Sequence, residues 1–212
     1  MIPIPTQIII TNPLFPTQST DLIITGASAG SLGAQVWSDQ MLTQLKGSLG
    51  WERAAIIADS YVGVFPEGSQ GPTMTDFGVC DSGVLDDMPE LQELCDQDVL
   101  TLQDMSSTSM SRHPDVPFAW IQSKADIVQK LYYDAIGLTI EMEIDAIDSS
   151  KFAGDMNDIY QGYTASGNDN AVSYLVDSLM HTYTLMDMVY HATSEGKKYW
   201  KILHEVRILY VF

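Results

Sequence analysis

The stretch Leu22-Ile23-Ile24-Thr25-Gly26-Ala27-Ser28-Ala29-Gly30 joins an apolar, β-branched run to a serine between two glycines. Its first four residues are typical of a strand buried on both faces of a parallel sheet. The small residues around Ser28 allow the sharp strand-to-helix turn of a nucleophile elbow, which lifts the serine hydroxyl out of the sheet. A serine hydrolase is the leading hypothesis. By itself, the five-residue pattern is about equally compatible with a turn that carries no catalytic residue.

The residues that follow the elbow supply the structural context that the motif needs. Apolar side chains recur there at spacings of three to five, at Leu32, Val36, Trp37, Met41 and Leu45. Such spacing indicates one apolar face of a helix. Strand, elbow and helix therefore occur in the required order.

Three further apolar runs predict strands of the same sheet, and each ends in small or polar residues. They cover residues 54–58, 116–121 and 172–176, and helix-like stretches lie at 88–95, 127–137 and 151–163. Alternating strands and helices predict an α/β fold with a mostly parallel, doubly wound sheet. We expect one domain over residues 1–212, with residues 61–111 forming a lid or insertion beside the site.

The composition excludes several classes of partner. A net charge of −18 disfavours nucleic acid, because proteins that bind it use Lys and Arg to neutralise phosphates. Uncharged or esterified ligands fit an acidic surface better than polyanions do. No apolar run is long enough to span a membrane, and the first residues lack the pattern of a secretory signal.

We expect neither a metal ion nor a cofactor. The acidic stretch 141–158 lacks the ligand spacing of a calcium loop, so a solvated face is the better interpretation. Cys80 and Cys95 have no CxxC pattern or histidine-rich surroundings, which disfavours zinc. The two cysteines are either buried thiols or partners in a small disulfide loop.

An activated serine needs a histidine as general base, and the chain has four histidines. In this fold class the order along the chain is serine, acid, histidine. His113 comes too early for that order, and His204 lies in a final helical stretch where a surface histidine is ordinary. We favour His181 over His191, because His181 follows the predicted strand 172–176 and would lie at the same sheet edge as Ser28.

Three aspartates compete to orient the histidine. Asp126 follows the predicted strand 116–121 and opens a helix, so it also fits a simple helix-terminal role. Asp59 comes one strand earlier than the usual position, and Asp177 is a weaker third choice. We favour Asp126.

Several segments together resemble the pectin acetylesterase and Notum family of α/β-hydrolase carboxylesterases. The resemblance extends from about Leu22 to Trp200 and rests mainly on residues 24–30, 57–60, 116–118, 123–129, 174–176 and 181–182, with Val189-Tyr190 and Gly196 completing it. It implies an α/β-hydrolase fold with Ser28 as nucleophile, Asp126 as orienting acid and His181 as base.

The resemblance also implies a substrate and a compartment. It suggests hydrolysis of an acyl ester, in the first place an acetyl ester, on a small molecule or a polysaccharide. Cys80 and Cys95 match a cysteine pair that is disulfide-bonded in relatives, which suggests the secretory pathway. The alternative is a non-catalytic or truncated α/β-hydrolase-like protein with a binding role.

Two features depart from the family pattern. Ser31 stands where relatives usually carry another glycine. Only 27 residues precede Ser28, although the fold normally places several strands and a glycine-rich oxyanion loop there. Ala29 N–H remains as one oxyanion donor without a candidate for the second, so we expect either a fragment that lacks the N-terminal strands or a degenerate member.

Overall fold

The computed structural model describes residues 21–140 and 146–184, with the short segments 193–194 and 197–198. In chain order the elements are β1 (Asp21–Ala27), α1 (Ala29–Val36), α2 (Ser38–Leu49), β2 (Arg53–Asp59), α3 (Gln70–Asp76), α4 (Pro89–Asp96), α5 (Leu102–Arg112), β3 (Phe118–Ser123), α6 (Ile127–Thr139), α7 (Ser149–Ala165), β4 (Ala171–Val176), β5 (Thr193–Ser194) and β6 (Lys197–Lys198).

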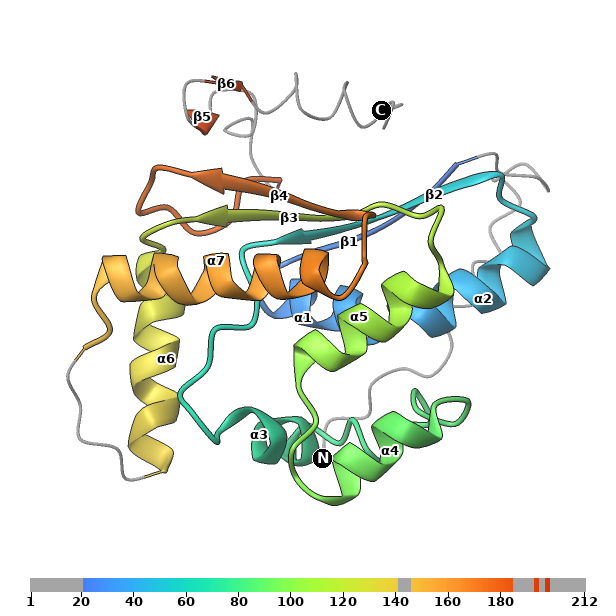
Figure 1. Ribbon diagram of the computed structural model, residues 1–212, viewed down its shortest axis with the longest axis horizontal. Coiled ribbons are helices and arrows are strands. Elements are labelled where there is room, and N and C mark those ends of the chain that lie inside the picture. Colours follow the sequence, from blue (N-terminus) through green and yellow to red (C-terminus); the bar gives the residue numbers. More distant parts are fainter. Residues whose placement is uncertain (1–20, 141–145, 185–192, 195–196, 199–212) are drawn as a thin grey trace.

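Strands β1, β2, β3 and β4 form one parallel sheet in that spatial order (Figure 1). Ile24 lies opposite Ile56 in the register, and Trp120 lies opposite Ser173. Because the strands are parallel, all four carboxyl ends meet at one edge, the edge where ligands bind in open α/β sheets. The α/β class and all four predicted strands are confirmed. The expectation that β1 is buried on both faces is wrong, because Ile23 and Thr25 are exposed and only Ile24 between them is buried.

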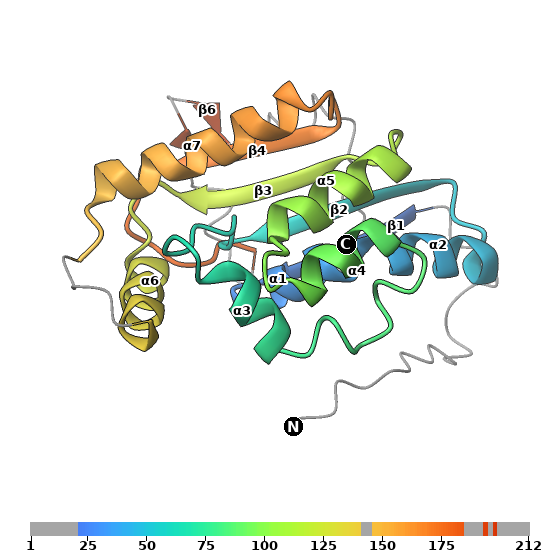
Figure 2. The ribbon, with the colours of Figure 1, turned by 60° about the horizontal axis from the view of Figure 1, so that its bottom comes forward.

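The helices α1, α2, α5 and α7 cover one face of this sheet, and both views show them on the same side (Figures 1 and 2). Right-handed crossovers between strands in consecutive order place every connecting helix on the same side. A doubly wound sheet needs a reversal of strand order. The described strands show no reversal, so the expected doubly wound arrangement is not seen in this part of the chain.

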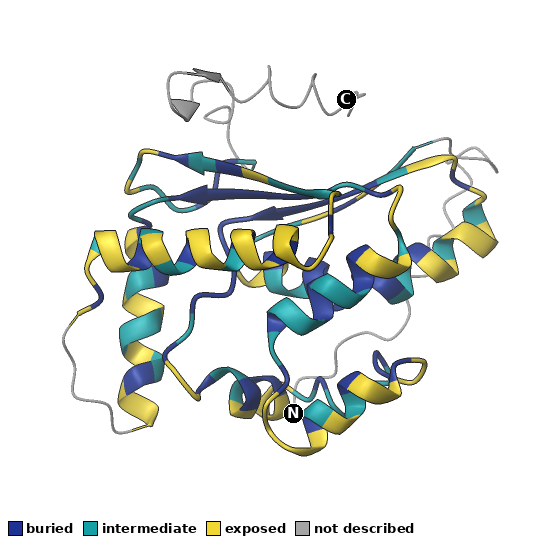
Figure 3. Cartoon of the chain, viewed as in Figure 1, coloured by how far each residue is buried: buried dark blue, intermediate teal, exposed yellow. Residues whose placement is uncertain are grey.

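The main core lies between the sheet and its helices. Ile56, Phe118 and Trp120 are buried on the helix-facing side of the strands. The Trp120 ring stacks on Tyr163 of α7 with ring centroids 5.0 Å apart. Figure 3 shows the corresponding division along α7, whose inner surface is buried and whose outer surface is exposed. Burying a large apolar side chain of this kind contributes roughly 1.5–3 kcal/mol.

The helix predictions hold with one difference. Helices at 88–95, 127–137 and 151–163 are confirmed as α4, α6 and α7. The apolar pattern of residues 32–45 predicts one helix, whereas the structure has α1 and α2 separated at Trp37, which has φ −90° and ψ 0°. The Trp37 N–H still donates to the Gly33 carbonyl oxygen, so the helix is interrupted at a single residue.

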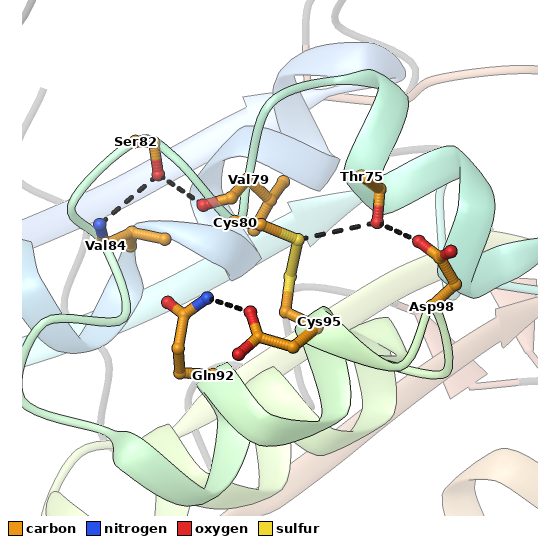
Figure 4. Close-up of a disulfide and its surroundings, with 9 residues drawn as sticks. Thr75, Val79, Cys80, Ser82, Val84, Gln92, Cys95 and Asp98 are labelled. Carbon is orange, nitrogen blue, oxygen red and sulfur yellow. Dashed lines mark hydrogen bonds between the residues drawn. A yellow bond between two sulfur atoms is a disulfide. The ribbon is translucent and has the colours of Figure 1, made fainter.

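The segment 61–111 contains α3, α4 and all of α5 except its last residue, and it carries most of a second apolar cluster that packs against α1 through Val36. A disulfide joins Cys80 to Cys95 of α4, with the two Cα atoms 5.7 Å apart (Figure 4). Thr75 of α3 contacts the Cys80 sulfur and donates a hydrogen bond to Asp98. The structure thereby decides between the two interpretations of the cysteines in favour of the disulfide.

The acidic stretch lies at the surface where it is described. Asp148 caps α7 by accepting hydrogen bonds from the Ser150 hydroxyl and from the Ser150 and Lys151 N–H groups, and these bonds hold the pKa of Asp148 below its ordinary value. Asp155 pairs with Lys151. Residues 141–145 lie outside the described residues. Within the described part of the chain, no helix combines the length and the hydropathy that a membrane span requires.

Candidate active site

Ser28 occupies a strained turn between β1 and α1. Its backbone has φ 56° and ψ −124°, a conformation that residues other than glycine rarely adopt. The Ser28 N–H donates to the Asp59 carbonyl oxygen at 2.8 Å, and the Ser28 carbonyl oxygen accepts from the Ser31 N–H at 2.9 Å. Unfavourable backbone angles that persist against their cost concentrate at functional sites. The local geometry is that of a nucleophile elbow.

The two glycines of the motif differ in their steric role. A Cβ atom on Gly26 would lie 2.0 Å from the Gly30 carbonyl oxygen, so the end of β1 and the start of α1 touch. A Cβ atom on Gly30 would meet nothing within 4 Å. The close approach therefore demands glycine at position 26 alone.

Ser28 is partly exposed, and Ala29 after it is exposed at the first position of α1. The N–H groups of a first helical turn have no intrahelical acceptor and attract negative charge. The Ala29 N–H is thus available for an oxyanion beside Ser28. Ser31 is fully buried, and its hydroxyl donates to the Tyr61 carbonyl oxygen at 3.4 Å, so the departure from glycine fits inside the protein.

Asp126 is completely buried at the carboxyl end of β3. One carboxylate oxygen, Oδ1, caps α6 by accepting the Val128 and Gln129 N–H groups, each at 3.0 Å. The other, Oδ2, accepts from the Gln122 and Gln129 side-chain amides at 3.1 and 3.0 Å. These four donors satisfy a buried carboxylate and keep its orientation fixed.

The same Oδ2 lies 2.8 Å from the Nδ1 atom of His181, in the loop after β4. A carboxylate without a proton only accepts hydrogen bonds, so this contact calls for a proton on Nδ1, and in the neutral ring the lone pair is then on Nε2. The Nε2 atom is buried and has no hydrogen-bond partner among the described residues. The contact with Asp126 therefore favours the neutral tautomer with its proton on Nδ1.

Ser28 reaches the same sheet edge, but the structure does not join it to the histidine. No hydrogen bond links Ser28 Oγ to His181 Nε2 in the described residues. Both residues are instead tied to the end of β2, Ser28 through the Asp59 carbonyl oxygen and the His181 loop through the Asp59 and Ser60 side chains. The sequence-predicted acid and base are brought into contact, and in the described part of the chain the predicted nucleophile lies at the same sheet edge without a hydrogen bond to the histidine.

Asp59 has a role different from the one considered for it. It is fully buried, and its Oδ2 accepts the Tyr183 N–H at 2.7 Å, the Thr184 N–H at 2.6 Å and the Thr184 hydroxyl at 2.7 Å. It makes no hydrogen bond with His181 in the described residues. Sequence reasoning placed Asp59 at the right edge but missed its link to the loop after β4, because that link joins residues more than 120 positions apart.

The remaining candidates lie elsewhere. His113 contacts Asp39 through Nε2 at 2.9 Å, and Arg112 contacts the same carboxylate. Asp177 is exposed and pairs with Lys124. His191 and His204 lie outside the described residues. Gln122 and Gln129 were missed as neighbours of Asp126, although Gln129 has the spacing of a capping box, three residues after this helix cap.

A hollow of about 480 Å³ lies at the opposite end of the sheet, where it is lined by the beginnings of β1 and β2 and by the segment before β3. Lys46, Arg53 and His113 are among its lining residues, and Ser28, Asp126 and His181 are not. Ligands of open parallel sheets bind at the carboxyl ends of the strands. The hydrogen-bonded groups, rather than this hollow, therefore define the candidate site.

A scan of the chain against models of known protein families finds no match, and a search among curated proteins also finds none.

Proposed function

We propose that the chain is a serine carboxylic ester hydrolase of the α/β-hydrolase type, with Ser28, Asp126 and His181 as its triad, and that it resembles the pectin acetylesterase and Notum family. One observation carries the proposal. His181 has Nδ1 on a buried carboxylate and a buried, unpartnered Nε2, at the sheet edge where Ser28 occupies a strained elbow. A buried polar atom without a partner needs an explanation, and a base that receives the serine proton is one.

The proposed reaction has two halves. In the first, Ser28 Oγ attacks the ester carbonyl carbon while His181 Nε2 takes the hydroxyl proton, and the alcohol leaves with that proton. In the second, water attacks the acyl-serine, again through Nε2, and releases the acid and the free hydroxyl. Asp126 holds the imidazole orientation and stabilises its charged form. The Ala29 N–H donates to the oxyanion formed in each half.

The mechanism requires a hydrogen bond between Ser28 and His181 that is absent from the described part of the structure. Catalytic hydrogen bonds often tighten only in the substrate complex. Ser28 Oγ and His181 Nε2 must therefore close on each other when an ester binds. Only one oxyanion donor is assigned, and loss of such a donor costs about 10² to 10³ in rate, so we expect slow turnover.

The acidic composition favours an uncharged or esterified substrate over a polyanion. The resemblance favours an acetyl ester, on a small molecule or on a polysaccharide. A second candidate function is ligand binding without catalysis, with the elbow retained for packing. The missing hydrogen bond between Ser28 and His181 is the observation that favours it.

Covalent labelling with a fluorophosphonate separates the two functions, because the reagent needs an activated serine. We expect an adduct on Ser28, located by peptide mass spectrometry, that is absent from Ser28→Ala and from His181→Gln. Ser166→Ala, at an exposed position after α7, is the control and should label like the wild type. A cooperatively folded wild type that takes no label would favour the binding function.

A further inference from the structure

The end of β2 holds the loop that carries His181. The Ser60 hydroxyl donates to Asp59 Oδ1 at 2.9 Å and accepts the Thr182 N–H at 2.8 Å. Asp59 Oδ2 receives the Tyr183 and Thr184 N–H groups and the Thr184 hydroxyl. Two adjacent side chains thus bind the three residues that directly follow His181, and we call this contact the β2 clasp.

The clasp is buried except at Thr184, which is partly buried. Asp59 and Ser60 are completely inaccessible to solvent, and Thr182 and Tyr183 are buried as well. Hydrogen bonds to a buried carboxylate are stronger than neutral ones, and the buried N–H groups of Thr182 and Tyr183 would be left unsatisfied if their acceptors were lost. The loop conformation therefore depends on these two side chains.

Backbone strain marks the same contact. Within the described residues, the non-glycine residues with positive φ are Ser28, Ser60, Thr182 and Asp98, and the first three all lie at this edge. Thr182 at φ 63° is the residue after the histidine and donates its N–H to Ser60, which itself has φ 63°. Such conformations persist only where the surroundings over-determine them.

The clasp also connects the two separate halves of the site. The Asp59 carbonyl oxygen accepts the Ser28 N–H at 2.8 Å, while the Asp59 carboxylate holds the loop of His181. The Ser60 carbonyl oxygen accepts the Gln129 amide, which also donates to Asp126. Asp59 and Ser60 thereby bind Ser28, the loop of His181 and the Gln129 side chain beside Asp126.

We infer that Asp59 and Ser60 are positioning residues, which set the place of His181 relative to Asp126 and Ser28 without touching the reacting atoms. This inference rests on the proposed function for its catalytic consequence. Its structural content, the orientation of the imidazole, is measurable without any activity.

Ser60→Ala is the sharper variant, because it removes one oxygen and leaves the Asp59 carboxylate in place. Asp59→Asn keeps the side-chain shape and removes the charge. Ser38→Ala and Asp39→Asn are matched controls. Ser38 is equally buried and donates to the Gln35 carbonyl oxygen, and Asp39 is a buried carboxylate bound to His113; neither contacts the His181 loop in the described residues.

Two measurements are made on each folded variant, well below its unfolding transition. The first is the ¹⁵N chemical shifts of the His181 ring, assigned with His181→Gln, which report how much of the imidazole carries its proton on Nδ1. The second is the rate of fluorophosphonate labelling at Ser28. We expect Ser60→Ala and Asp59→Asn to populate the Nε2–H tautomer and to label about 10- to 100-fold more slowly, since small misplacements of catalytic groups cost this much.

The controls should keep the wild-type tautomer and rate. Wild-type shifts in both clasp variants would overturn the inference, whatever the labelling shows. A wild type that is not labelled while the clasp variants still change the tautomer would refute the proposed function and support the positioning role.

Discussion

Gly26 and Gly30 lie against each other at the elbow, with the position of a Gly26 Cβ atom only 2.0 Å from the Gly30 carbonyl oxygen. The contact is between backbone atoms, which cannot rotate away. Gly26→Ala must therefore push β1 and α1 apart. We expect it to lower the free energy of unfolding by about 3 kcal/mol, the upper range for overpacking a tight site.

Gly30→Ala is the matched control for this prediction, since its Cβ atom would enter open space. Alanine in a helix is more favourable than glycine by up to about 1 kcal/mol. Denaturant unfolding of both variants tests the contrast. Equal stabilities of the two alanine variants would contradict the close approach.

Asp126→Asn separates the two tasks of this residue. Asparagine caps a helix about as well as aspartate, so α6 should keep its N-terminus. The amide can donate toward His181 Nδ1 and thereby favour the wrong tautomer. We expect fluorophosphonate labelling of Ser28 to slow by about 10⁴-fold, as in a comparable triad. The melting temperature should also fall, because the new amide would face the Gln122 and Gln129 amide donors.

Asp177→Asn changes the exposed partner of Lys124 and serves as the control. Its labelling rate should equal that of the wild type. Unchanged labelling of Asp126→Asn would remove Asp126 from the triad and reopen the choice of acid.

The disulfide should stabilise the segment that it closes. Cys80 and Cys95 are 15 positions apart, and a closed loop of this length contributes about 3 kcal/mol in the chain-entropy account. The double variant Cys80→Ser, Cys95→Ser should lose about that amount in denaturant unfolding. Reduction of the wild type should reproduce the loss, and the double variant should not respond to reductant.

Replacing Tyr160 with phenylalanine should increase the stability of the protein. Its hydroxyl is buried and has no hydrogen-bond partner among the described residues, while its ring packs edge-on to Trp120. Tyr160→Phe keeps the ring and removes the unsatisfied group, so we expect a gain of about 1 kcal/mol. Tyr132→Phe, at an exposed position of α6, should change nothing.

Tyr160 should also make the stability of the protein depend on pH in the alkaline range. Burial raises the pKa of Tyr160 well above its ordinary value of 10.0. The neutral phenol is favoured in the folded state, so its contribution is complete below pH 10 and declines as the unfolded chain begins to ionise above it. Tyr160→Phe should therefore unfold less readily above pH 10 than the wild type does. If the free energy of unfolding changed equally with pH above pH 10 in both proteins, the burial of the Tyr160 hydroxyl would be contradicted.

The sequence pattern predicted only one helix, 88–95, in the segment 61–111, and α5 at its end was missed. Residues 102–112 are rich in serine and lack a strong apolar period, so α5 was not predicted. A local signal was present, because the Thr101 hydroxyl accepts the Asp104 N–H while the Asp104 carboxylate accepts the Thr101 N–H. That reciprocal pair is a capping box and marks a helix start.

The sequence by itself determined the local features of this protein. Apolar runs of four to six residues predicted each strand of the parallel sheet, and small residues around Ser28 predicted the elbow, because strand formation and a tight turn depend on neighbouring side chains. The order of Ser28, Asp126 and His181 along the chain was readable in the same way.

Only the tertiary structure decided which buried acid meets the histidine. Asp59 and Asp126 both follow strands, and local chemistry does not distinguish them. The parallel register places β4 beside β3, so the His181 ring reaches Asp126, while the residues after it cross to Asp59 at the end of β2. Contacts between residues 55 and 124 positions apart depend on packing of the whole sheet.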